Sequence, residues 1–356
     1  MIHPDSRTIA WIRQVAAENN FTDITLIEKT IRAFSLLEAL TLSGCPFVFK
    51  GGTSLMLHLN SARRLSIDID IICPPGTDIE QYLQKHARDY GFSEVKLVDR
   101  ISTNNIPKSH AKFFYQATYA THTNTEYILL DVLFEDIHYS NVIPLPIASP
   151  FLKTGGEPAI VNVPSSADLL GDKLTAFAPN TTGIPYFKNN KSYAMEIIKQ
   201  LFDIGSLFDV INDLIIVAKT FRTFSSIELT YRGFDSENIT QVLDDIYQTS
   251  LCICLKGDVD TDNFKQLQEG IKRIQHFIHS EKYRLDNAII SASKAAYLSV
   301  LIANQITKVN RFNPNNIEPL RNVVIESPMP AKLNKLKRSN IESFFYWNEI
   351  SKLQTP

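Results

Sequence analysis

The sequence predicts an α+β protein: an α/β-like N-terminal domain, built as a mixed sheet flanked by helices, followed by a mainly helical C-terminal domain. Up to about residue 188, short runs of β-branched and aromatic residues alternate with helical patterns. From about residue 191 onward, apolar residues recur at helical spacing. The loop NTTGIPYFKNNK at 180–191 separates these two sequence patterns. We therefore predict domains at 1–188 and 189–356.

The elements of the first domain are expected in a regular order. A helix over 22–43 begins with Thr25 and Glu28 as a capping box and ends at Gly44. Strands are expected at 47–49, 65–72, 111–120 and 127–134, the last two as a hairpin, and helices from Gly51, at 77–90 and at 166–178. Helices of the second domain are expected at 192–211, 240–251, 264–279 and 295–306.

Composition indicates an ordinary globular protein. Apolar residues make up 44% of the chain and charged residues 21%, and the net charge of −2 provides no global basic field for nucleic acid. No apolar run approaches the roughly 18 residues that span a bilayer, and the N-terminus lacks the layout of a secretory signal. The four cysteines lack metal-ligand spacing. We expect a cytoplasmic protein with reduced, buried thiols and no membrane partner.

Three aspartates interrupt predicted strands. Asp68 and Asp70 lie two apart in LSIDIDII and therefore share one face, while Asp131 interrupts YILLDVLF. Carboxylates in such places need a partner, and a divalent ion that prefers oxygen ligands, such as Mg²⁺, would supply one. The alternatives are two exposed carboxylates on a half-open sheet and, for Asp131, an ion pair with a distant Arg or Lys.

Two further features point to a phosphate-bearing ligand. Gly51 and Gly52 lie between a strand and a helix N-terminus, where backbone N–H groups, helped by the hydroxyls of Thr53 and Ser54, can approach a phosphate. A plain tight turn is the alternative, and no Walker or dinucleotide motif accompanies the glycines. Lys173 lies on the apolar side of its predicted helix, so its ammonium must reach solvent or meet an anion.

Taken together, these stretches resemble the AbiEii-type nucleotidyltransferase toxin family, within the DNA polymerase beta superfamily. The matching residues are Gly51–Leu55, then Arg64, Ser66, Asp68, Ile69 and Asp70, then Lys173 in LLGDKLTAF, and Lys199, Asp203 and Asp209 in KQLFDIGSLFD. The resemblance covers about 24–215. Ile67, at a position that is often acidic in relatives, and the insertion PNTTGIPYFKNNKSYAM depart from the family pattern.

The resemblance implies a metal-dependent nucleotidyltransferase that moves an NMP from an NTP to a hydroxyl acceptor, such as tRNA, and releases pyrophosphate. Two Mg²⁺ ions, or Mn²⁺ in their place, would be held by the three aspartates. Nucleotide would be bound by Gly51, Gly52, Thr53, Ser54, Ser66 and Lys173. We expect Asp203 to lie opposite Lys173 across the cleft and to steer it, whereas the alternative is a surface ion pair with Lys199.

The same resemblance implies the toxin of a type IV, AbiE-like toxin–antitoxin or abortive-infection system, with a cognate antitoxin as partner and no DNA partner. Other functions stay open at this point. A small-molecule, antibiotic-type nucleotidyltransferase would keep the fold and change the acceptor. Asp-x-Asp also occurs in phosphatases and glycosyltransferases, and a nucleotide-binding module without catalysis would keep the pocket. The basic run Lys332, Lys335, Lys337 and Arg338 would contact phosphate only if the acceptor is RNA.

Overall fold

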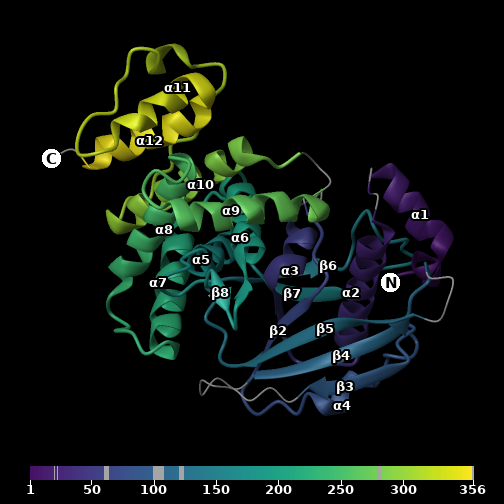
Figure 1. The fold of residues 1–356 in the computed structure, drawn as a ribbon. Coiled ribbons are helices and arrows are strands. Elements are labelled where there is room, and N and C mark those ends of the chain that lie inside the picture. Colours follow the sequence, from purple (N-terminus) through teal and green to yellow (C-terminus); the bar gives the residue numbers. More distant parts are fainter. Residues whose placement is uncertain are drawn as a thin grey trace. The chain divides into compact units, whose positions relative to one another are not determined.

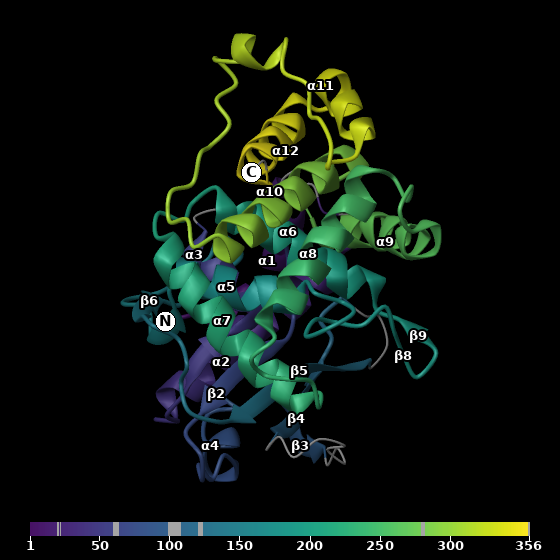
Figure 2. The same ribbon diagram turned by 90° about the vertical axis from the view of Figure 1, so that its left-hand side faces the viewer.

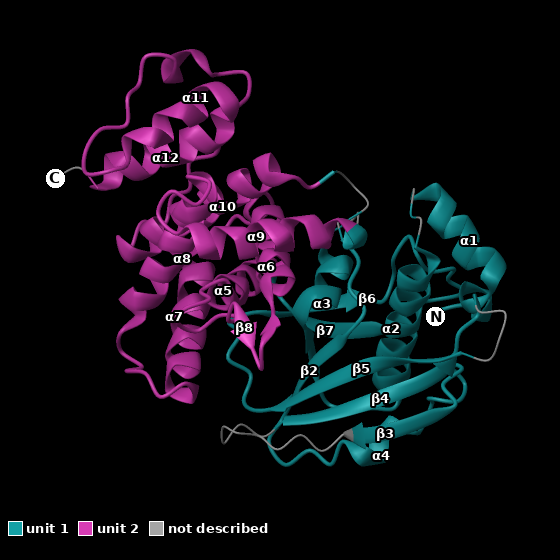
Figure 3. Ribbon diagram, viewed as in Figure 1, with its two compact units in different colours: residues 1–165, 276–282 teal, residues 166–275, 283–356 magenta. Residues whose placement is uncertain are grey.

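The structure, a computed structural model, consists of two compact units (Figures 1–3). Unit 1 comprises residues 1–165 and 276–282, and unit 2 comprises residues 166–275 and 283–356. The structure describes residues 1–19, 21, 23–59, 64–98, 108–119, 124–278 and 282–354. The predicted domain boundary at 188/189 falls inside unit 2, because the helix at 166–176 packs against the helices that follow it.

Unit 1 is built on a five-stranded mixed sheet in the order β1-β2-β5-β4-β3. The strands are β1 (Val48–Lys50), β2 (Ile69–Cys73), β3 (Glu94–Val98), β4 (Lys108–Gln116) and β5 (Thr125–Phe134). β2 and β5 run parallel, and the other neighbours are antiparallel. The predicted mixed sheet and the predicted hairpin of the last two strands are therefore confirmed. β6 (Val142–Pro146) and β7 (Ile160–Pro164) form a separate two-stranded sheet.

The helices of unit 1 are η1 (Pro4–Arg7), α1 (Ile9–Glu18), α2 (Ile24–Leu42), α3 (Gly51–His58) and α4 (Glu80–Leu83). Among them, α2 packs on one face of this sheet, and η1 and α1 pack against α2. Along β5, Ile128, Leu130 and Val132 are buried while the residues between them are partly exposed, which is the alternation of a half-buried strand. α2 packs against β5 and β2 (Figure 1). The opposite face carries the residues that alternate with this core, among them Leu129 and Asp131 on β5.

Two buried glutamates attach α2 to the rest of unit 1. Glu38 accepts hydrogen bonds from the backbone N–H of Ile2 (2.9 and 3.1 Å) and from the hydroxyl of Tyr90 (2.6 Å). Glu28 lies 3.3 Å from Arg32 and accepts hydrogen bonds from the backbone N–H and hydroxyl of Thr118. Each carboxylate is thus satisfied inside the protein, which makes its burial tolerable.

Unit 2 is helical apart from a short hairpin. Its elements are α5 (Ser166–Ala176), β8 (Phe187–Lys188), β9 (Lys191–Ser192), α6 (Ala194–Phe208), α7 (Leu214–Tyr231), α8 (Ile239–Cys254), α9 (Thr261–Ile274), η2 (Gln275–Phe277, which crosses into unit 1), α10 (Leu285–Ala303), η3 (Glu318–Leu320), η4 (Ala331–Lys335), α11 (Leu336–Ser339) and α12 (Ile341–Gln354). Gly171 lets α5 approach α7 closely, because a Cβ there would lie 2.7 Å from the backbone oxygen of Val217. The predicted helical second half is confirmed.

Several predicted boundaries differ from the structure. α2 is capped by Asp23, whose side chain accepts a hydrogen bond from the backbone N–H of Thr25, so the capping box at Thr25 was wrong. The α-helix expected at 77–90 is confined to α4, followed by turns. The 180–191 loop contains the β8–β9 hairpin, and α10 begins ten residues before the helix expected at 295. Local patterns locate elements well but their ends poorly.

Among the residues that the structure describes, one helix, α10, is long and apolar enough to span a membrane by length and composition alone. However, 78% of its apolar window is buried inside the protein, against α6, α8 and α12, as in a core helix. The four cysteines are free and buried, as expected for reduced thiols.

Candidate active site

A row of polar residues crosses the sheet of unit 1. The strand register pairs Lys50 with Asp70, Asp70 with Asp131, and Asp131 with His110. Residues directly opposite one another on neighbouring strands point to the same face, and their strands lie about 4.8 Å apart. This row therefore gathers side chains from β1, β2, β5 and β4 on the face opposite α2. Two of the three predicted aspartates are adjacent in it.

Asp131 and His110 are in direct contact. The Nδ1 atom of His110 is hydrogen-bonded to Oδ1 of Asp131, and the two side chains are 13% and 35% exposed respectively. The sequence analysis missed His110, because its position beside Asp131 depends on the β4–β5 register. The available signal was its place among the outward residues of β4, which alternate with the buried Ala111 and Phe113. His110 holds one oxygen of Asp131 and leaves the carboxylate partly open to solvent.

The glycine pair lies against the motif residues themselves. Gly51 has a φ of +81°, and a methyl group there would overlap the carboxylate of Asp70. At Gly52, an added Cβ would lie 2.6 Å from Nη2 of Arg64 and 3.0 Å from Oγ of Ser66. The turn that begins α3 is therefore the point on which Asp70, Arg64 and Ser66 converge. Neither position tolerates a side chain without displacing one of these groups.

Thr53 and Ser54 direct their hydroxyls into the protein. Thr53 Oγ1 donates a hydrogen bond to the backbone oxygen of Asp68 (2.6 Å), and Ser54 Oγ donates to that of Gly51 (2.9 Å). Both side chains are fully buried. Thr53 thereby fixes the backbone of exposed Asp68, which lies directly before β2. Direct binding of nucleotide by these two hydroxyls stays a prediction.

The carboxylates suit a divalent metal in chemistry. Asp70 and Asp131 offer hard oxygen donors on adjacent strands, and the overlap at Gly51 shows that the Asp70 side chain lies over the start of α3. Within the residues that the structure describes, no group of three or more His, Cys, Asp or Glu side chains forms a ready-made metal cluster. A metal at this row would therefore rely on Asp70 and Asp131, with Asp68 completing the set on binding.

Unit 2 holds the predicted lysine–aspartate pair. Nζ of Lys173, on α5, lies 3.0 Å from Oδ2 of Asp203 and donates a hydrogen bond to Oε1 of Gln200 (3.0 Å), both on α6. Lys173 is 6% exposed and Asp203 2% exposed. The predicted contact of Lys173 with Asp203 is present. Both side chains are buried, whereas the alternative was an ion pair of Asp203 with Lys199 on the protein surface. Asp209 instead pairs with Lys294, at 2.8 Å.

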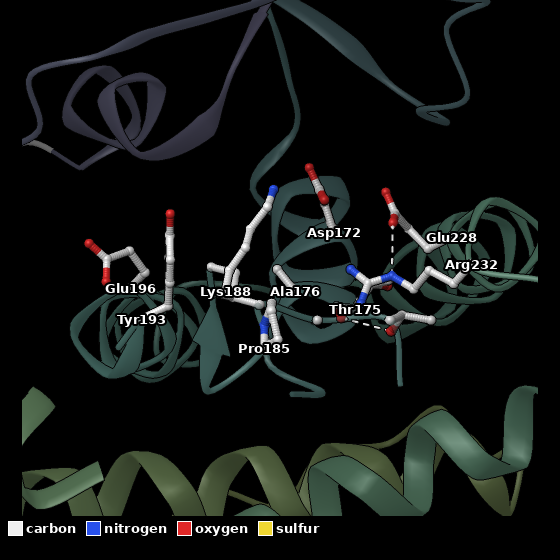
Figure 4. Close-up of a pocket in the computed structure, with 12 residues that line it drawn as sticks. Asp172, Thr175, Ala176, Pro185, Lys188, Tyr193, Glu196, Glu228 and Arg232 are labelled. Carbon is white, nitrogen blue, oxygen red and sulfur yellow. Dashed lines mark hydrogen bonds and ion pairs between the residues drawn. The ribbon is translucent and has the colours of Figure 1, made fainter. Parts of the chain in front are cut away.

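A pocket of about 390 Å³ lies in unit 2 (Figure 4), and neither Lys173 nor Asp203 is among its lining residues. Its lining includes Asp172, the neighbour of Lys173, and Glu196, one helical turn before Gln200. Other lining residues are Thr175, Ala176, Thr182, Gly183, Ile184, Pro185, Lys188, Tyr193, Glu228 and Arg232. In Figure 4, the side chains of Asp172 and Lys188 extend in the same direction. The lining therefore combines apolar residues with charges of both signs.

The basic run of unit 2 is engaged with the protein. Lys332 forms an ion pair with Asp258, and Lys337 donates hydrogen bonds to the backbone oxygens of Arg321 (3.1 Å) and Val323. Two of the four basic side chains in this run thus have structural partners, which favours the interpretation as an ordinary surface segment.

Comparison with known proteins adds a family match. The model of the family "Nucleotidyl transferase AbiEii toxin, Type IV TA system" matches residues 35–275. Among solved structures, JHP933 from Helicobacter pylori is similar with 12% identity and a TM-score of 0.40, over 78% of this chain and 91% of that one. The nucleotidyltransferase toxin MenT4 from Mycobacterium tuberculosis H37Rv is similar with 13% identity and a TM-score of 0.44, over 78% and 97%. No curated protein matches the sequence.

Proposed function

The chain belongs to the AbiEii family of nucleotidyltransferase toxins of type IV toxin–antitoxin systems, and on that basis we propose that it transfers an NMP from an NTP to a hydroxyl of an RNA, such as a tRNA. In this reaction the acceptor oxygen forms a bond to the α-phosphorus, and the bond from that phosphorus to the pyrophosphate breaks. The observation that carries the proposal is the register of Asp70 with Asp131 beside the Gly51 turn.

Each residue has a defined task in this proposal. Bound Mg²⁺ would neutralise charge on the triphosphate and lower the pKa of the acceptor hydroxyl. Asp68, Asp70 and Asp131 would hold the metal, and Asp131 would orient the hydroxyl and accept its proton. His110 keeps Asp131 in one orientation by its hydrogen bond. Lys173 would bind the triphosphate, and Asp203 holds that ammonium in place.

The proposal is tested by following label from each [α-³²P]NTP in the presence of Mg²⁺ and total tRNA. We expect label in RNA for the wild type and none for Asp70→Asn, whose fold should stay intact, or be slightly stabilised in the metal-free protein because a repulsive charge is removed. Asp262→Asn is the matched control, since that side chain is 93% exposed and pairs only locally with Lys265. Turnover of Asp70→Asn at the wild-type rate would refute the metal-dependent mechanism.

A small-molecule acceptor is the second candidate. The pocket of unit 2 is of a size that suits a small polar molecule, with Lys188 and Arg232 near Asp172, Glu196 and Glu228. The same labelled reactions, run with aminoglycosides and other polyhydroxy compounds in place of tRNA, separate the two. Label in a small molecule and none in RNA would favour this candidate.

Co-expression with the protein of the adjacent gene tests for an antitoxin by rescue of growth.

A further inference from the structure

The sheet face that bears Asp131 carries a second set of side chains beyond the polar row. Two and four positions along from that row, the outward residues are Lys112 and Phe114 on β4 and Leu129 and Tyr127 on β5, and β3 adds Lys96. Because side chains alternate along a strand, these residues share the face of Asp131 and His110. Phe114 and Tyr127 are register partners, and their ring centroids lie 5.8 Å apart.

Lysines lie over both rings. Nζ of Lys112 is 4.3 Å from the centroid of Tyr127, and Nζ of Lys96 is 5.1 Å from that of Phe114. Tyr127 is 40% exposed, which is unusual for a large ring on a strand that is otherwise half-buried. Two adjacent rings with ammonium groups above them offer stacking surfaces together with charges that match phosphate.

We propose that this face binds the single-stranded 3′ end of the RNA acceptor. The inference rests on the proposed function, and it adds where the RNA lies. The terminal hydroxyl would lie at Asp131, and a base farther from the end would stack on Tyr127 and Phe114. Tyr127 lies four positions before Asp131 on β5, which is roughly 13 Å along the strand. Lys112 and Lys96 move from the rings to the phosphates when the bases stack.

One acidic residue opposes this binding. Glu94 pairs with Lys96 at 3.1 Å, and both side chains are more than half exposed. Glu94 is also the register partner of Phe114, so its carboxylate lies where a phosphate would approach. Replacing Glu94 with Gln removes that competitor and keeps the side-chain size. We therefore expect Glu94→Gln to bind RNA more tightly, whereas removal of the rings or of a lysine should weaken binding.

The experiment is fluorescence anisotropy of a labelled eight-nucleotide single-stranded RNA with the full chain, Mg²⁺ and no NTP. We expect Tyr127→Ala with Phe114→Ala to weaken binding roughly 5- to 150-fold, and Lys112→Ala to lower the salt slope by about one. Tyr127→Phe keeps the ring and should bind as the wild type does. Glu94→Gln should bind more tightly, with a steeper salt dependence.

A lysine–aromatic pair away from the sheet provides the matched control. Nζ of Lys85 lies 5.1 Å from the ring centroid of Tyr82, next to α4, and Tyr82→Ala with Lys85→Ala should leave RNA binding unchanged. Thermal melts of all variants establish that they fold. Unchanged binding after loss of both rings would overturn the proposal.

Label transfer to tRNA, measured on the same variants, separates this inference from the proposed function. Wild-type transfer that persists without the two rings places the acceptor elsewhere and leaves the nucleotidyltransferase intact. Ring-dependent RNA binding without transfer by the wild type supports the RNA-binding face and refutes the proposed reaction.

Discussion

Gly51 shows how one residue can hold a charged group in place. Its φ of +81° is a conformation that residues with a side chain adopt at a cost, and its missing Cβ leaves room for the carboxylate of Asp70. Glycine is therefore favoured at position 51 for two reasons: the backbone has a positive φ, and the carboxylate of Asp70 occupies the space that a Cβ would fill. A second glycine in unit 1, Gly44, has almost the same φ, +79°, and no atom within 4 Å of an added Cβ.

The two glycines allow a matched comparison. We expect Gly44→Ala to lower the free energy of unfolding by about 1 kcal/mol through backbone strain alone. Gly51→Ala should lower it by about 1–3 kcal/mol more, because the added methyl must displace Asp70. Urea denaturation measures both losses. Equal losses would show that Asp70 does not press on Gly51, and wild-type nucleotide transfer by Gly51→Ala would show that the position of Asp70 is not critical.

The burial of Lys173 and Asp203 changes what substitution of either should do. Removing Asp203 leaves a buried ammonium, so Asp203→Ala should lower the free energy of unfolding by about 3–5 kcal/mol. The double variant Lys173→Met, Asp203→Leu removes both charges and should recover most of that loss. If Lys173 binds the triphosphate, the double variant stays unable to bind NTP by calorimetry. NTP binding restored by the double variant would make the pair purely structural.

At the scale of elements, the sequence predicted what local periodicity determines. The helices α2 and α6 and the strand around Asp131 could be predicted from the sequence. Burial of one face gives each of these elements a regular pattern of apolar residues. The alignment of Lys50, Asp70, Asp131 and His110 in one row could not be predicted from the sequence. The register between strands depends on contacts between residues that are distant in sequence. Asp70 and Asp131 were found as candidates, whereas their direct pairing and His110 needed the structure.

The end of α3 should make unit 1 sensitive to acid. Burial lowers the pKa of His58, in the last turn of α3, against the opposing effect of a hydrogen bond with the backbone of Pro164. The unfolded chain takes up this proton near pH 6.5, before the folded protein does. The unfolded state therefore binds more protons as the pH falls below that value, and the free energy of unfolding decreases.

This pH dependence can be assigned by substitution. Denaturation between pH 7 and pH 5 should show a smaller loss of stability for His58→Gln than for the wild type. His86→Gln, which removes a histidine that is 38% exposed, is the control and should keep the wild-type slope. An identical slope in His58→Gln and the wild type would rule out His58 as the source.

At the scale of the whole molecule, unit 1 is not one continuous piece of chain. Residues 276–282 follow α9 of unit 2 yet belong to unit 1. The backbone N–H of Leu65 donates a hydrogen bond to the oxygen of Phe277 (2.7 Å), and Arg64 forms a β-bridge with Ile278. This segment thus supports the residues that lead into Asp68, and Arg64 in turn contacts the Gly52 turn.

A substitution in the segment 276–282 should increase the mobility of residues 64–72, although the two segments are far apart in sequence. Ile278 is 7% exposed, so Ile278→Asp buries a charge and should lower the free energy of unfolding of unit 1 by at least about 2 kcal/mol. Hydrogen exchange should rise at residues 64–72. Ile137→Asp, at a site 44% exposed, should leave exchange there unchanged. Unaltered exchange in Ile278→Asp would show that the segment is dispensable.

The same segment sets a time order during synthesis. A nascent chain that has reached residue 165 has all the strands of the sheet, but the partner of Arg64 and Leu65 is still missing. At about 5–20 residues per second, that partner arrives on the order of 10 s later. During this interval the ribosome is producing most of the helices of unit 2. A chain built in this order therefore lacks the backbone partners of Arg64 and Leu65, just before Asp68, until α5 to α9 of unit 2 have been synthesised.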